Sequence, residues 1–156
     1  MKKLIIMLFG LLLVSGVFAA GNETSFVLNF GTTTDDGLHF KPFWWTVGGE
    51  LDFQIRNYLM FSPEVTLVGS GSNFKDFFFR PAVILNFTPG NFFVGGGLTK
   101  HFYIGHNTIY DTSDIALKLN AGLISRNIKL TAYLITYFDN LFKSAMWVGA
   151  SLGFRF

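Results

Sequence analysis

Seven charged residues stand out because each lies in a segment of alternating apolar residues, where a charge is costly unless it is paired and hydrogen-bonded. They are Glu50, Asp52, Glu64, Arg80, Lys118, Lys129 and Arg155. Such a set could line a selective, gated passage, or it could neutralise itself as a salt-bridge network that fills an interior. Glu64 and Arg80 share the same parity on neighbouring segments, so we expect these two to pair.

The histidines are the other residues that could carry chemistry. They are His39, His101 and His106. Deacylation or acyl transfer would need a histidine beside a serine and a carboxylate or asparagine, but no serine is set beside a histidine and no His-x-Ser-Asn signature occurs. Metal ligands are not convincingly spaced, and the glycines at 95–97 are not followed by the helix that a phosphate loop requires. We therefore expect no catalytic residues, no cofactor, no metal site and no enzyme activity.

The elements that must position these residues are eight segments of alternating polarity. They cover about 24–32, 42–55, 58–68, 77–87, 92–104, 114–124, 128–138 and 145–156. Most are near the ~9–11 residues that a tilted strand needs to cross the hydrocarbon layer. Tight turns alternate with longer, charged loops, which is the pattern of an outer-membrane barrel. An even number of strands also places both termini on the short-turn, periplasmic side.

Alternation assigns the two faces of each strand. In the second segment, Val47, Leu51 and Phe53 share one parity, whereas Glu50 and Asp52 share the other. In a membrane barrel the apolar set faces lipid and the polar set faces the lumen. A soluble, lipocalin-like barrel would reverse the faces; it also predicts a Gly-x-Trp signature near the first strand, which the sequence lacks.

Aromatic residues gather at the strand ends and predict an interfacial girdle at the rim that carries the longer loops. The girdle residues are Trp44, Trp45, Phe77, Phe79, Tyr103, Tyr137 and Trp147.

Three residues fit a barrel wall less well. Pro63 and Pro81 fall inside strands, where proline cannot donate to the ladder, so we expect a bulge or local gap there. Lys100 has lipid-facing parity, which is tolerable near the rim or beside a bulge that shifts the register.

The N-terminus predicts a cleaved signal peptide over residues 1–20. A basic start is followed by an apolar core and a small-x-small site, with cleavage after Ala19 or Ala20. Lys2 and Lys3 are the only charged residues in this segment, so the remaining chain has ten basic and ten acidic residues. A neutral chain has little electrostatic affinity for nucleic acid. The longest uncharged stretch after the signal, 81–99, contains turn residues at 88–91, so no helical span is expected and a closed barrel remains.

The last eleven residues alternate between apolar residues and small or polar ones, with Trp147 as the one bulky exception, and end on the apolar series Leu152, Phe154 and Phe156. This ending resembles the closing strand of small bacterial outer-membrane β-barrels of the OmpX/OmpA type (opacity-protein-like), in which such residues are an assembly signal read by the barrel-assembly machinery. The resemblance covers the mature chain in architecture but only this strand in motif, so it carries over no functional residues.

The resemblance implies an all-β fold: an eight-stranded antiparallel up-and-down transmembrane β-barrel over residues 21–156, monomeric and located in the bacterial outer membrane. The expected partners are outer-membrane lipid and, during biogenesis, the barrel-assembly machinery. An eight-stranded barrel is only just wide enough for side chains, so we expect a plugged lumen, no large pore, and a structural or surface-interaction role. The alternatives are an outer-membrane lipid-modifying enzyme and a small pore or transport barrel.

Overall fold

The fold is that of a computed structural model, which describes residues 23–34, 37–41, 43–71, 77–105, 108–111, 114–138, 141 and 146–156. The predicted signal peptide and His106 lie outside these residues. No helix in the described part of the chain is long and apolar enough to cross a membrane.

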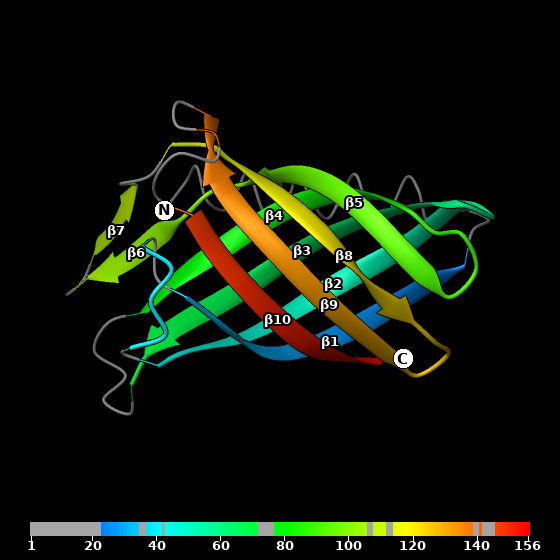
Figure 1. The fold of residues 1–156 in the computed structure, drawn as a ribbon, viewed down its shortest axis with the longest axis horizontal. Helices are drawn as coiled ribbons and strands as arrows, with labels where there is room; N and C mark the ends of the chain where they lie inside the picture. The colour runs from blue at the N-terminus through cyan, green and yellow to red at the C-terminus, as the bar shows by residue number, and fades with distance from the viewer. Residues whose placement is uncertain are drawn as a thin grey trace.

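The described chain is a closed, antiparallel barrel (Figure 1). Its strands are β1 (Thr24–Thr33), β2 (Trp44–Arg56), β3 (Leu59–Ser70), β4 (Phe77–Phe87), β5 (Phe92–Thr99), β6 (Phe102–Gly105), β7 (Thr108–Asp111), β8 (Ala116–Ile124), β9 (Ile128–Tyr137) and β10 (Met146–Arg155). Neighbours in the wall are mostly neighbours in the chain, and β10 pairs with β1 to close it. The predicted antiparallel eight-stranded barrel is therefore confirmed, with β5 and β6 together forming one wall position.

The predicted segment 92–104 is divided because the ladder to β4 is interrupted at Pro81. Thr99 pairs with Ala82 and Phe102 pairs with Phe79 in one continuous register, and Lys100 and His101 between them form no strand. Proline has no backbone N–H to give to this ladder. A second gap occurs between β2 and β3 at the level of Pro63. Each proline therefore interrupts the ladder on one side of its strand, whereas the β3–β4 ladder between the two prolines, where the gap was expected, is continuous.

β7 departs from the sequence prediction, which had a loop at this point. It pairs with β6 alone, so the two strands form a hairpin that extends beyond the barrel wall (Figure 1). The register runs from Phe102 opposite Asp111 to Gly105 opposite Thr108. Residues 105–111 lack the long alternating run that marked the other strands, which is why the pattern did not reveal this short one.

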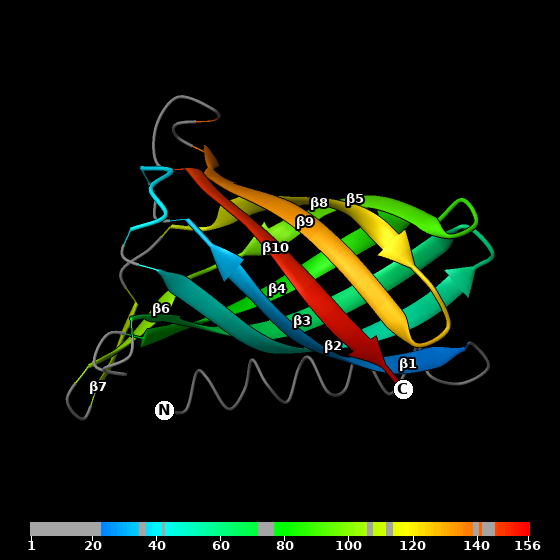
Figure 2. The same ribbon diagram turned by 60° about the horizontal axis from the view of Figure 1, so that its bottom comes forward.

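The two ends of the barrel differ in their connections (Figure 2). We call the end with the turns at 57–58, 88–91 and 125–127 the turn end, where Phe156 also lies; the opposite end, which carries the longer connections, is the loop end.

Polarity in this barrel is the reverse of that in a soluble protein. Arg80 and Lys129 are fully buried inside, whereas Phe154 and Leu130 on the outer face are 44% and 47% exposed. The faces therefore follow the lipid-facing assignment, and the soluble-barrel alternative is wrong. Most of the exposed large apolar side chains belong to the strands and face outward.

Candidate functional site

The interior near the turn end is organised around Lys129. Its ammonium lies 2.7 Å from Glu50 Oε1 and 2.9 and 3.1 Å from the two Asp52 carboxylate oxygens. The hydroxyl of Ser62 donates to Asp52 at 2.6 Å, and Asn86 donates to Ser62 at 2.9 Å. One buried cation thus holds two carboxylates from the opposite side of the barrel, each tied further into the wall.

A second ion pair lies further along the lumen, where Lys118 donates to Glu64. The Lys118 ammonium also lies 4.7 Å from the centre of the Tyr133 ring, and Arg80 approaches the same ring at 5.2 Å while donating to its hydroxyl at 3.1 Å. Both cations therefore share one aromatic ring, which attracts them through its electron-rich face.

The expected Glu64–Arg80 pair is wrong. The β3–β4 register places Thr66, not Glu64, opposite Arg80, so Arg80 lies nearer the loop end. Lys118 reaches Glu64 from β8 instead, a contact across the interior that strand parity could not reveal. Within the described residues, Arg80 Nε and Nη1 have no hydrogen-bond partner, and Tyr133 supplies the contact that a carboxylate was expected to make.

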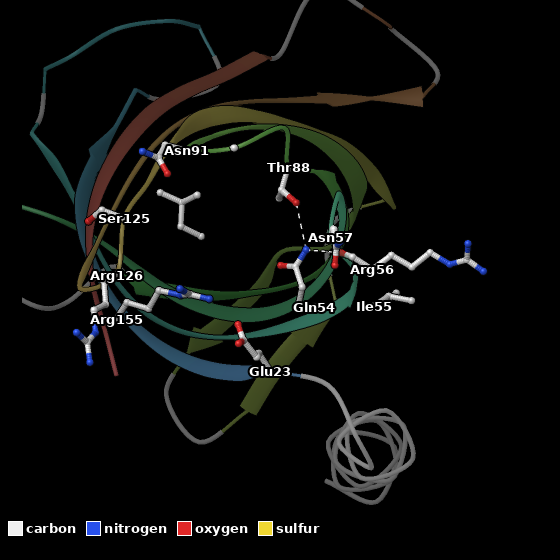
Figure 3. Close-up of a pocket in the computed structure, with 12 residues that line it drawn as sticks. Glu23, Gln54, Ile55, Arg56, Asn57, Thr88, Asn91, Ser125, Arg126 and Arg155 are labelled. Atoms are coloured by element: carbon white, nitrogen blue, oxygen red, sulfur yellow. Dashed lines mark hydrogen bonds between the residues drawn. The ribbon is translucent and has the colours of Figure 1, made fainter.

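Arg155 completes the set of seven, and it lies at the mouth of the turn end. Its Nε is 3.9 Å from Asp52 Oδ2, and its guanidinium extends into a polar cavity of about 660 Å³ (Figure 3). Glu23 and Gln54 also line this cavity, and Gln54 donates to Thr88 at 3.2 Å. The cavity is an open, water-accessible bowl, with the Lys129 cluster lying further inside.

The loop end of the lumen is filled by aromatic rings rather than charges. Trp147 packs 5.8 Å from Trp44, 5.6 Å from Phe78 and 5.4 Å from His101 between ring centres. His101 Nδ1 shares a 3.0 Å hydrogen bond with the Tyr137 hydroxyl. We call these five residues the aromatic plug; four of them come from inward-facing strand positions near the loop end, and His101 lies in the interruption between β5 and β6.

The aromatic plug corrects the girdle prediction. Trp44, Tyr137 and Trp147 belong to the interior cluster or pack against it, so these three face inward. Tyr103 shares the parity of Phe78, with the two rings 5.0 Å apart, but stays 40% exposed at the rim. The position of a residue at a strand end predicts its depth along the barrel axis but not whether it faces the lumen or the outside. Its parity within the strand decides which of the two faces it takes. The remaining girdle residues have outward parity: Trp45, Phe77 and Phe79.

Among the charged layers of the lumen little space remains. The cavity described there is about 20 Å³ and is lined by Glu50, Glu64, Lys118 and Tyr133 among others. That volume is comparable to the space needed for one water. The charged and aromatic layers therefore leave no wide passage through the described interior.

Gly149 shows how tightly Tyr133 is fitted. A Cβ added at Gly149 would lie 2.3 Å from Tyr133 Cζ and 2.7 Å from the backbone oxygen of Thr32. We expect Gly149→Ala to lower the free energy of unfolding by about 1–3 kcal/mol, the usual cost of overpacking. Gly49→Ala is the matched control, because its Cβ would be 3.4 Å from the nearest atom, an outward Phe26 carbon. Urea titration in lipid vesicles measures both, and equal midpoints would contradict this packing.

Sequence reasoning did not identify Ser62, Asn86 and Tyr133 as partners of the lumen charges. The sequence gives their inward parity, but it does not show which residues of other strands they contact. Among the described residues, no group of three His, Cys, Asp or Glu side chains could hold a metal ion. His101, the described histidine with lumen parity, packs among aromatic rings and bonds to a tyrosine hydroxyl.

The fold and its filled interior define a small eight-stranded barrel of the outer-membrane type. The structure is similar to the N-terminal β-barrel domain of Pseudomonas aeruginosa OprF, with a TM-score of 0.52, 16% identity, and coverage of 86% of this chain and 99% of that one. It is also similar to neisserial surface protein A, NspA, with a TM-score of 0.51, 12% identity, and coverage of 85% and 94%. No protein-family model and no curated protein sequence matches the chain. The resemblance to small outer-membrane barrels is therefore confirmed at the level of fold.

Proposed function

We propose that this chain is a monomeric integral outer-membrane barrel with a structural or surface-interaction role and a plugged lumen. The observation that carries the proposal is the distribution of polarity: buried charges inside, most of them in ion pairs, and apolar side chains outside. Lipid is the solvent in which such an outer face is stable, and a closed barrel satisfies every backbone group within it.

In this proposal, residues 1–20 direct export and are removed, and residues 21–156 form the barrel. Both termini and the turn end face the periplasm, and the loop end faces outward. Leu152, Phe154 and Phe156, which are exposed on the outer face or at its edge, are read by the assembly machinery. Within the described part of the chain the interior offers no arrangement that supports catalysis, so the proposed role rests on the barrel and its outer loops.

Cell fractionation with protease treatment tests the location. The protein should sediment with the outer membrane, and a protease-sensitive tag inserted in the 72–76 connection should be cleaved in intact cells. The same tag at the 125–127 turn should be cleaved only after the cells are permeabilised. Reversed accessibility of the two tags would overturn the orientation, and recovery in the soluble fraction would overturn the membrane assignment.

The purified protein should not form a stable, large conductance in planar bilayers. The aromatic plug fills the loop end, and the Lys129 and Lys118 ion pairs fill the lumen between it and the open cavity at the turn end. These packed side chains leave little room for ions, and the charges of Lys129 and Lys118 are neutralised by their carboxylate partners. Brief, weak openings are compatible with small wet spaces, and a porin inserted in the same bilayer is the positive control. A steady current that depends on Glu50 or Arg80 would replace this role with that of a pore.

A further inference from the structure

An apolar groove of about 270 Å³ lies on the outer face of the wall, between the loop-end parts of β4, β5 and β8. Its outward side chains are those of Pro81, Val83, Leu98, Lys100 and Ile115. Lys100 is the charged member of this lining, and the others are aliphatic. Val83, Leu98 and Ile115 are exposed on the outer face.

The groove arises where the wall is interrupted. β5 ends at Thr99 and β8 begins at Ala116. The β5–β8 pairing, which runs from the turn end, therefore stops at this pair of residues. On the other side, Pro81 gives no N–H to the ladder, and its carbonyl accepts hydrogen bonds from the Lys100 N–H at 3.3 Å and from the Thr99 hydroxyl at 2.8 Å. Two of the three residues that fitted a barrel wall less well in the sequence, Pro81 and Lys100, therefore line the same depression.

The position of Lys100 indicates the level in the membrane at which the groove lies. Its ammonium lies 5.8 Å from the centre of the Phe102 ring, and Phe102 stacks on Phe79 at 4.9 Å. Phe79 is one of the outward aromatic residues near the loop end, and such residues sit at the headgroup level of a bilayer. The lysine stem thus lies along apolar surface while its charge reaches the interface, where the cost of a lipid-facing lysine is small.

We propose that this groove is a binding site for one membrane lipid with an anionic phosphate headgroup. The acyl chain lies against Val83, Leu98 and Ile115, and the phosphate contacts the Lys100 ammonium. Charge complementarity supports this occupant, since an ammonium is a compact point charge suited to phosphate. The inference rests on the proposed membrane location and adds a specific lipid to it.

Native mass spectrometry of the full barrel, released from vesicles that contain equal amounts of phosphatidylglycerol and phosphatidylcholine, tests the site. Wild-type protein should retain one lipid with a preference for phosphatidylglycerol. Lys100→Gln should lower that preference about fivefold, the effect expected of one lysine at an anionic lipid surface. Val83→Phe, which fills the groove, should lower retention of both lipids.

Lys41→Gln and Val148→Phe are the matched controls, since Lys41 is an exposed lysine elsewhere and Val148 is an outward valine on β10. Both should behave as wild type. An unchanged preference in Lys100→Gln, or loss of lipid in the controls as well, would overturn the site. The lipid site would also be overturned by a wild-type dimer that Val83→Phe abolishes, or by release of the lipid when inorganic phosphate alone is added. Failure of the barrel to insert into vesicles would instead contradict the proposed function.

Discussion

Replacing Lys129 with methionine should destabilise the barrel by about 3–5 kcal/mol, the cost of removing one partner from a buried ion pair. Lys129 is fully buried and contacts both Glu50 and Asp52, so its loss leaves two carboxylates facing each other away from water. Urea titration of the protein in lipid vesicles, followed by tryptophan fluorescence, measures the change. Lys41→Met is the control, because an exposed lysine contributes a fraction of a kcal/mol.

A triple variant tests whether unpaired charge causes the loss of stability in Lys129→Met. Adding Glu50→Gln and Asp52→Asn to Lys129→Met removes the unpaired charges while nearly keeping the side-chain volumes. The triple variant should regain most of the lost stability, because a neutral hydrogen-bonded interior avoids the penalty of an uncompensated charge. A triple variant that is less stable than the single one would show that packing, not charge, determines the role of Lys129.

Phe156→Ala should remove most of the assembled protein from the outer membrane in cells. The backbone of Phe156 pairs with Phe26 in both directions, at 2.8 and 3.2 Å, and the two rings stack at 6.4 Å across the β1–β10 seam. Alanine keeps both backbone bonds and removes only the ring, so the variant isolates recognition of the aromatic side chain. Deletion of Phe156 also removes the backbone pair and should be at least as severe.

Phe92→Ala is the matched control, an outward phenylalanine at the turn end but away from that seam. Refolded in vitro, Phe156→Ala and Phe92→Ala should lose similar stability, because each loses one exposed ring. In cells only Phe156→Ala should fail to assemble. Equal membrane yields for the two variants would contradict an assembly signal at Leu152, Phe154 and Phe156.

The sequence by itself determined the class of fold and the face of most residues. Period-two alternation is a local property of each strand, so it placed Glu50 and Lys129 inside and Phe154 outside without knowledge of any partner. The prolines likewise predicted gaps in the hydrogen-bond ladder, because the missing backbone N–H is a property of proline itself.

Only the tertiary structure decided which inward residues meet. Glu64 pairs with Lys118 rather than Arg80 because contacts across a lumen depend on the stagger of all the strands around the barrel, which no single segment records. The same stagger brings the rings of Trp44 and Trp147 into contact in the plug, although parity alone already placed both on the inward face. It also places Lys100 and Ile115 in the same groove, because the interruption of the ladder at Pro81 and the end of the β5–β8 pairing lie at the same level of the closed wall.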